Sequence, residues 1–315
     1  MKAIVYDRYG GPEVLEERDV PSPRPGRGEV LVRVRAAALN PKDVLVRSGK
    51  FRWLTGSRFP LPFGHDWAGE VVETGHGDVP FAVGDRVFGC WNEARVRRGS
   101  LAQYAVSDVD ACGPMPASLS FEEAASLPLA GQTALQALRD VAVVRAGDRL
   151  LVHGAAGGVG TLAIQVGKAL GAHVSTTSSA RNLAFCASLG ADTTLDYAAD
   201  TPLAAGSQHD VVFDVYGNLS FRKVRPALSL RGTYVTTVPS PRIAFDAART
   251  LLTPQRARLV IIAPRQRDLA TLTHWVEEKC LRPVVDRVFA WSEVRDAARY
   301  LETRHARGKV VVRVP

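Results

Sequence analysis

The first 120 residues contain short runs in which apolar and polar positions alternate. Turn signals rich in proline and glycine, such as Pro21–Gly26, separate these runs. A period of two residues with such boundaries is typical of β-strands. The pattern therefore predicts a β-rich domain with irregular loops. Its expected strands are Ala3–Tyr6, Glu29–Arg35, Ala68–Glu73, Asp85–Phe88 and Leu101–Val106.

The pattern changes near Ser120, where strand-like apolar runs begin to alternate with helical ones. Ser120 and Glu123 have the spacing of a capping box and mark the start of a helix. Such alternation predicts an α/β domain with a doubly wound parallel sheet. Further helices are expected at Gly131–Arg139, Leu162–Leu170, Leu183–Leu189 and Phe221–Leu230. Strands are expected at Leu150–Val152, from His173 onward, and at Val211–Asp214, Thr233–Thr237 and Leu259–Ile262.

The last residues return to the β pattern. Strands are expected at Val284–Phe289 and Val310–Val314, on either side of a helix from Ser292 to Leu301. We expect this tail to pack back on the first, β-rich domain.

The segment His153–Gly160 follows an apolar strand, precedes an apolar helix and has the spacing G-x-x-G-G-x-G. Glycine lets a backbone approach a pyrophosphate, and a helix start offers free N–H groups and a partial positive charge. A glycine cluster alone also suits any tight turn, but the strand–turn–helix context favours dinucleotide binding. We therefore predict that Gly157, Gly158 and Val159 contact a cofactor.

The composition is that of a soluble globular enzyme: 315 residues, 46% hydrophobic and 23% charged, enough for two domains. No apolar run approaches the ~20 residues of a membrane helix, and no signal-like segment follows Met1. We therefore expect a cytoplasmic protein without a membrane partner. The net charge of +8 is scattered, which disfavours nucleic-acid binding but suits an anionic cofactor. The four cysteines form no C-x-x-C pair, which argues against a zinc knuckle or a disulfide framework.

Six motifs follow one another along the chain: Ala36–Asp43, Pro62–Glu70, Val83–Val87, Leu127–Ala134, His153–Gly160 and His305–Val310. In this order they resemble the medium-chain dehydrogenase/reductase superfamily, specifically its zinc-free quinone oxidoreductase (zeta-crystallin-like) branch. The resemblance implies a GroES-like catalytic domain at residues 1–121 and 280–315 and a Rossmann domain at 122–279, with the cofactor in the cleft between them.

Zinc-dependent relatives hold a catalytic ion with Cys, His-Glu and a second Cys or Asp. The matching positions here are Asn40, His65–Asp66 and approximately Leu129. One imidazole cannot hold Zn²⁺, which needs about three protein ligands and an open position. We therefore expect no metal site and no metal-assisted alcohol oxidation. His65 is then a residue that lines the substrate site or a structural hydrogen-bonding group.

Without a metal, the resemblance implies hydride transfer to an acceptor that delocalises charge itself, such as a quinone or a conjugated enone or enal. Asn40 matches the family's polar residue beside the nicotinamide, where it would position nicotinamide and substrate. Its other interpretation is a turn residue before Pro41. Many relatives carry Tyr five residues after the Asn, but here Leu45 would line the substrate site without a proton to give. The proton donor therefore stays open between solvent and a cofactor hydroxyl.

The end of the second Rossmann strand has no Asp or Glu to accept from a ribose 2′-hydroxyl. Ser178, Ser179 and Arg181 can instead donate to a 2′-phosphate, which predicts NADP(H). The alternative for Arg181 is a solvated residue that opens a helix, and for Lys309 a surface charge. Further cofactor contacts that the resemblance implies are Thr133, Tyr197, Gly217, Thr237, Val238 and Lys309.

The leading hypothesis is an NADPH-dependent reductase of quinones or conjugated enones and enals. A second is an enoyl reductase of polyketide-like biosynthesis, whose glycine-rich stretch is similar to His153–Gly160. A third, of a different class, is a non-catalytic crystallin-like or RNA-binding protein. We also expect a homodimer formed by joining Rossmann sheet edges, with Leu259–Ile262 as the contributing strand. The physiological acceptor stays open.

Overall fold

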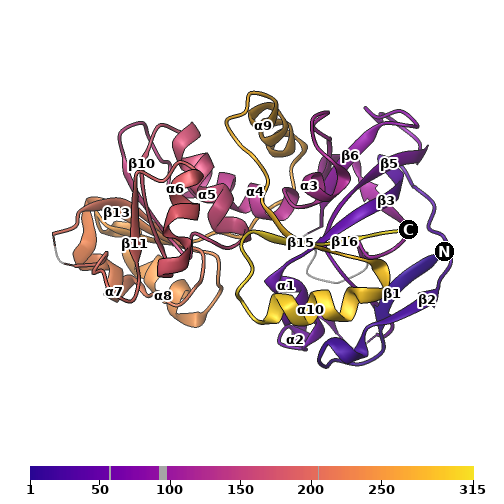
Figure 1. The fold of residues 1–315 in the computed structure, drawn as a ribbon, viewed down its shortest axis with the longest axis horizontal. Helices are drawn as coiled ribbons and strands as arrows, with labels where there is room; N and C mark the ends of the chain where they lie inside the picture. The colour runs from indigo at the N-terminus through magenta and orange to yellow at the C-terminus, as the bar shows by residue number, and fades with distance from the viewer. Residues whose placement is uncertain (57, 92–97, 205) are drawn as a thin grey trace. The chain divides into compact units, whose positions relative to one another are not determined.

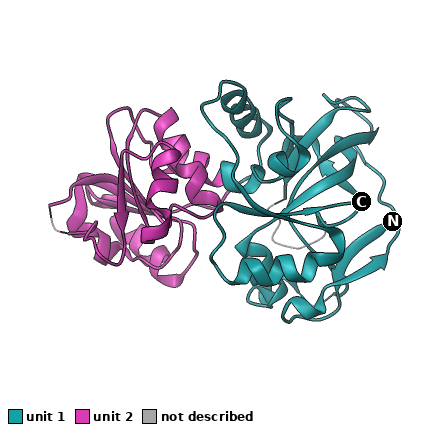
Figure 2. Cartoon of the chain, in the orientation of Figure 1, with its two compact units in different colours: residues 1–132, 263–315 teal, residues 133–262 magenta. Residues whose placement is uncertain are grey.

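The computed structural model describes the chain except residues 57, 92–97 and 205 and the side chain of residue 54. The chain forms two compact units, residues 1–132 with 263–315 (unit 1) and residues 133–262 (unit 2), as Figure 2 shows. Unit 2 is thus a continuous segment inserted into unit 1.

Unit 1 is built around a seven-stranded sheet in the order β15-β16-β3-β5-β6-β8, with β7 also pairing with β3. Strand β3, Glu29–Leu39, buries Val30, Val32 and Val34 completely, because alternate side chains of a strand share one face. Only β15 and β16 pair in parallel among these strands. The other strands are β5 (Asp66–Thr74), β6 (Arg86–Cys90), β7 (Tyr104–Asp108), β8 (Cys112–Pro114), β15 (Val285–Phe289) and β16 (Lys309–Arg313).

A three-stranded sheet of order β2-β1-β4 and several helices also belong to unit 1 (Figure 1). The strands are β1 (Lys2–Tyr6), β2 (Glu16–Asp19) and β4 (Leu61–Pro62). The helices are α1 (Pro41–Arg47), α2 (Arg52–Thr55), α3 (Phe121–Ala125), α9 (Gln266–Glu277) and α10 (Val294–Glu302).

Unit 2 is a doubly wound domain with a fully parallel sheet of order β11-β10-β9-β12-β13-β14. The strand order reverses beside β9, so the carboxyl ends of β9 and its two neighbours frame the position where such folds bind ligands. The strands are β9 (Arg149–His153), β10 (His173–Ser178), β11 (Thr193–Asp196), β12 (His209–Asp214), β13 (Leu228–Thr236) and β14 (Arg256–Leu259). The helices are α5 (Gly158–Ala169), α6 (Leu183–Ser188), α7 (Phe221–Val224) and α8 (Pro241–Arg249), and α4 (Pro128–Leu135) crosses into the unit.

The unit boundaries at 132/133 and 262/263 differ from those expected at 121/122 and 279/280. Helices α3 and α9 pack on the β-rich unit, because α3 contacts β3 and β5 and α9 contacts β8. A Cβ on Gly113 of β8 would lie 2.6 Å from Cβ of Leu269, so the glycine lets α9 approach the sheet closely.

Two expected elements were placed wrongly. The helix expected at Phe221–Leu230 ends as α7 at Val224 and a short 3₁₀ turn, and β13 begins at Leu228. Pro226 lacks the N–H that a longer helix needs. The strand expected at Leu259–Ile262 is β14, Arg256–Leu259, which begins three residues earlier.

The capping box at the start of α3 is confirmed. The backbone N–H of Ser120 donates to Glu123 Oε2 at 2.9 Å, and the N–H of Glu123 donates to Ser120 Oγ at 3.3 Å. Among the described residues, none of the helices combines the length and the apolar character that a bilayer crossing requires.

Candidate functional site

The glycine-rich turn between β9 and α5 holds two kinds of glycine. Gly160 is required by the protein's own packing, because a Cβ there would lie 2.5 Å from the carbonyl oxygen of Gly154. At Gly157 a Cβ would meet only that same oxygen, at 3.8 Å, and the φ of −82° suits any residue. The packing of the chain therefore leaves the Gly157 side open to a ligand.

The start of α5 supplies hydrogen-bond donors at the same place. Gly157 is the N-cap residue and carries no side-chain cap. The first helical hydrogen bond runs from the N–H of Thr161 to the oxygen of Gly157 at 2.9 Å. The N–H groups of the half-buried Gly158 and Val159 therefore stay outside the helical ladder, and such groups bind phosphate. The residues fit a dinucleotide pyrophosphate, and the contact of Gly157, Gly158 and Val159 with a cofactor stays a prediction.

His153, which the sequence did not single out as a site residue, ties three strand ends together. Its Nδ1 lies 2.6 Å from Thr177 Oγ1 at the end of β10, and its Nε2 lies 2.8 Å from Asn218 Oδ1 after β12. The ring therefore braces the carboxyl edge of the sheet beside the glycine turn.

The residues predicted for a 2′-phosphate come together after β10. The N–H of Tyr197 donates to the oxygen of Ser178 at 3.1 Å, which places the exposed tyrosine beside the strand end. Arg181 is exposed in a 3₁₀ turn directly after Ser179. Ser178 is buried and donates its hydroxyl to the oxygen of Ser179, so Ser179, Arg181 and Tyr197 are the accessible members.

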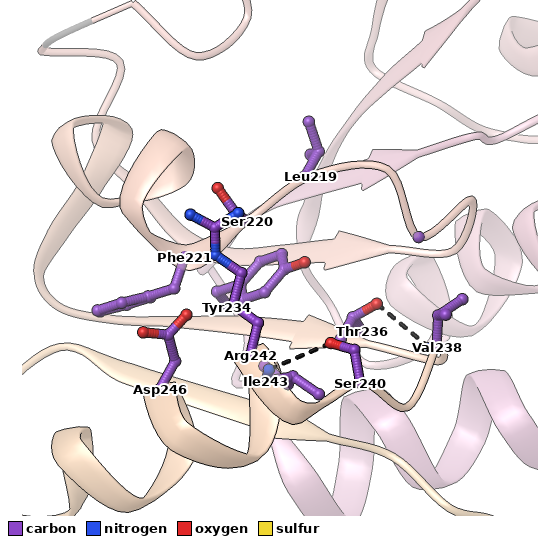
Figure 3. A pocket seen from close by; sticks show the side chains of 11 residues that line it. Leu219, Ser220, Phe221, Tyr234, Thr236, Val238, Ser240, Arg242, Ile243 and Asp246 are labelled. Carbon is purple, nitrogen blue, oxygen red and sulfur yellow. Dashed lines mark hydrogen bonds between the residues drawn. The ribbon is translucent and has the colours of Figure 1, made fainter.

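A cavity of about 80 Å³ lies beyond the carboxyl ends of β12 and β13 (Figure 3). Gly217 and Val238, two of the predicted contacts, line it and pack together, since a Cβ on Gly217 would lie 2.2 Å from Val238 Cγ2. Buried Asp214 holds the loop by accepting from the N–H of Gly217 at 2.7 Å and from Tyr234 Oη at 3.1 Å. Burial, followed by the Asp214 charge, raises the pKa of Tyr234, which keeps the hydroxyl protonated as a donor. Thr237 Oγ1 donates to the oxygen of Val215 at 3.2 Å, next to this cavity.

In unit 1 a buried polar cluster surrounds Asn40 and Asp66. Lys309 Nζ donates to Asn40 Oδ1 at 2.5 Å and to Asp66 Oδ2 at 2.9 Å. Asn40 Nδ2 donates to the same Asp66 oxygen at 3.0 Å, and the N–H of Leu129 donates to Asp66 Oδ1 at 2.8 Å. Lys309 is 5% exposed and is therefore not the surface charge that was its alternative interpretation.

This cluster does not fit a zinc ion. The positions that match the ligands of zinc-dependent relatives hold an amide at Asn40 and an aliphatic side chain at Leu129, and the Lys309 ammonium already neutralises Asp66. Zn²⁺ is held by thiolates, imidazoles and carboxylates. Cys90 lies nearby, but burial, followed by the charge of Asp66, raises the pKa of its thiol, which disfavours the thiolate that a metal requires. Within the described part of the chain, no three His, Cys, Asp or Glu side chains gather as a metal site.

The helix cap of α1 positions a second buried pair. Asp43 is the third residue of α1 and accepts from the N–H of Asn40, the N-cap residue, at 2.6 Å through Oδ2. Its Oδ1 hydrogen-bonds His65 Nδ1. Both side chains are buried, with 0% of the Asp43 side chain and 6% of the His65 side chain exposed. The sequence marked His65 but missed Asp43, although the spacing Asn40–Asp43 is that of a capping box.

Three further predicted residues lie as follows. The Asn40 amide is fully engaged, because its NH₂ also donates to the oxygen of Ala38 at 3.4 Å. Leu45 is half-buried on α1. Thr133 is buried on α4 as the first residue of unit 2.

Comparison with known proteins gives concordant similarities. The family description "Alcohol dehydrogenase GroES-like domain" matches residues 26–117, and "Zinc-binding dehydrogenase" matches residues 189–312. The chain is 34% identical to a chloroplast envelope quinone oxidoreductase homolog of Arabidopsis thaliana, over 99% of this chain and 98% of the relative. It is 37% identical to an Arabidopsis chloroplastic NADPH-dependent alkenal/one oxidoreductase, over 99% of this chain and 79% of that one. The structure of the quinone oxidoreductase from Coxiella burnetii superimposes with a TM-score of 0.90 at 35% identity, covering 100% of this chain and 99% of the other.

Proposed function

Because the chain belongs to the quinone oxidoreductase branch of the medium-chain dehydrogenase/reductase family, and is an oxidoreductase, we propose that it uses NADPH to reduce quinones and conjugated enones or enals without a metal ion. The observation that carries the proposal is the Asp66–Lys309 pair. In this pair a protein cation, the Lys309 ammonium, contacts Asn40 and Asp66, two positions that match ligand positions of zinc-dependent relatives.

The preference for NADPH is supported by the edge after β10. Ser179, Arg181 and Tyr197 gather there on accessible positions, and Arg matches phosphate geometry with several donors. Asp196 ends the neighbouring strand, but its Oδ1 accepts from the N–H of Ala198 at 3.0 Å, so this carboxylate is engaged by its own turn. NADPH, when bound, supplies the hydride.

The acceptor class follows from what the chain offers around Asn40. Because the described residues around Asn40 do not fit a zinc ion, we expect an acceptor that itself delocalises the negative charge that the hydride brings. The residues of unit 1 then hold the acceptor in position and exclude water, which strengthens the electrostatic interactions.

The proposal is tested by purifying the protein, measuring its metal content and following NADPH oxidation with a panel of acceptors. We expect turnover with quinones and conjugated enones or enals, weaker turnover with NADH, and no loss of activity after treatment with a chelator. Stoichiometric zinc that turnover requires, or oxidation of simple alcohols, would overturn it.

We further propose a homodimer that forms through the free edge of the unit 2 sheet. Strand β14 is the terminal strand, and an edge strand leaves its backbone groups available for pairing with a second copy. Leu252, which is 97% exposed, and Leu251 precede this edge and would be covered in such an assembly.

A further inference from the structure

Reduction by a hydride leaves an oxyanion on the acceptor, and the product needs a proton as well. Leu45 stands where many relatives carry a Tyr, so the chain has to find this proton elsewhere. We propose that His65, held by Asp43, donates the proton from Nε2 to the acceptor oxygen. This inference rests on the proposed function.

The backbone holds both members of the pair on regular elements. Asp43 is fixed by the cap of α1, as described above. His65 directly precedes β5, and its carbonyl oxygen accepts from the N–H of Trp91, after β6, at 3.2 Å. The side chains therefore meet without the ordering of a loop, as a positioned acid requires.

The hydrogen bond decides which nitrogen is available. Asp43 Oδ1 engages Nδ1, so a ring that carries a proton on each nitrogen has Nε2 as the one that can give its proton to an acceptor. Nε2 has no partner among the described residues. The Asp43 side chain is completely buried, whereas part of the His65 ring is exposed, so a proton that leaves the pair leaves through His65.

The surrounding charges favour His65 over its neighbours as the donor. Asp66 and Lys309 neutralise each other, and two of the three Lys309 N–H groups are held by Asp66 and Asn40. Burial raises the pKa of the Cys90 thiol, which makes it too weak an acid for the task. The charged groups on the elements around His65 are Lys42, Asp43 and Arg47 on α1, Asp66, Glu70 and Glu73 on β5, and Lys309 and Arg313 on β16.

The step balances as follows. The acceptor receives a hydride, that is two electrons and one proton, from NADPH, and one of its oxygens becomes an oxyanion. The N–H bond at His65 Nε2 breaks while an O–H bond forms on that oxygen. His65 regains its proton from water after the product leaves, so each turnover consumes one NADPH and one solvent proton.

The test compares two quinones of similar size in single turnovers with NADPH. One is methyl-substituted and gives a weakly acidic hydroquinone, which needs the donor. The other is chlorinated and gives a more acidic hydroquinone, whose anion can leave without protonation. His65→Gln should slow the first quinone about 10²- to 10³-fold, in the range of general acid catalysis. It should slow the second by less than about fivefold, because little proton transfer is needed there.

Asp43→Asn should show the same selectivity to a smaller degree, because it removes only the charge that orients the ring. His274→Gln, an exposed histidine on α9, is the matched control and should leave both rates unchanged. A fluorescence titration checks that each variant binds NADPH, and the thermal midpoint checks that it is folded. Equal slowing of both quinones, or slowing of neither, would overturn the role of His65. A wild-type protein that turns over neither quinone would instead refute the proposed function.

Discussion

Lys309→Met should destabilise unit 1, because it removes the cation from a carboxylate that water cannot reach. Lys309 is 5% exposed, Asp66 is 0% exposed, and their charged atoms lie 2.9 Å apart. The substitution leaves Asp66 with only the N–H donors of Asn40 and Leu129. Breaking a buried pair in this way costs about 3–5 kcal/mol.

The double variant Lys309→Met with Asp66→Asn measures the coupling energy between the two charged side chains. Because neither side chain is then charged, the loss should be smaller than the sum of the two single losses, with a coupling energy of about 2–3 kcal/mol. Additive losses, or a loss below about 1 kcal/mol for Lys309→Met, would refute the buried ion pair.

Urea unfolding followed by tryptophan fluorescence provides the assay. All five tryptophans lie in unit 1, and residues 133–262 contain none, so the signal reports unit 1 alone. Trp67 directly follows Asp66 in the chain, and it is buried with its ring centroid 5.7 Å from that of buried Trp91. A signal from unit 1 alone is needed, because a protein of two units need not unfold in a single step.

Three further predictions follow from the same structure. Arg181→Ala should raise KM for NADPH about ten- to hundredfold and leave NADH kinetics nearly unchanged, since a charge-assisted hydrogen bond contributes roughly 1.5–3 kcal/mol. Steady-state kinetics with both cofactors measure this difference, and an equal effect on both would contradict the contact of Arg181 with the 2′-phosphate. Leu252→Arg should convert a dimer to a monomer in light scattering, and an unchanged mass would exclude this edge as the interface. At pH 8 a thiol reagent should modify one cysteine of the native protein, the exposed Cys280, as detected by mass spectrometry. Burial raises the pKa of the other three thiols, so rapid modification of Cys90, Cys112 or Cys186 would contradict the structure.

The sequence predicted most of the fold because its periodic patterns are local. The alternation in Glu29–Arg35 and the run at Leu150–Val152 each specify a strand within a few residues. The predictions failed where a single residue or a distant partner determines the local structure, as at Pro226, which ends the helical segment that begins with α7. The boundaries of the compact units differ from the expected ones for the second reason, because α9 packs on β8, about 150 residues earlier in the chain, which no local pattern reveals.

The candidate site was predictable where one motif holds it. The turn at Gly157 is predicted from neighbouring residues, and its contact with a cofactor stays a prediction; a Cβ at Gly157 would meet only the oxygen of Gly154, at 3.8 Å. The buried cluster was not predictable in this way, because Lys309, Asn40 and Asp66 come from three distant segments. Each polar residue alone looks like a surface or turn residue. Only the sheet register, which pairs β16 with β3 and β3 with β5, brings them together.

The insertion of unit 2 into unit 1 imposes an order on folding during synthesis. Strand β16 lies between β15 and β3, so the large sheet of unit 1 cannot be completed until residues 309–313 leave the ribosome. Residues 133–262 form a continuous segment with its own parallel sheet, and they emerge earlier. Unit 2 can therefore fold first, as domains generally do during synthesis, while the edge of β3 that pairs with β16 stays open. A nascent chain stopped before β16 would expose an unpaired edge of β3, the kind of surface that chaperones bind and that otherwise leads to aggregation.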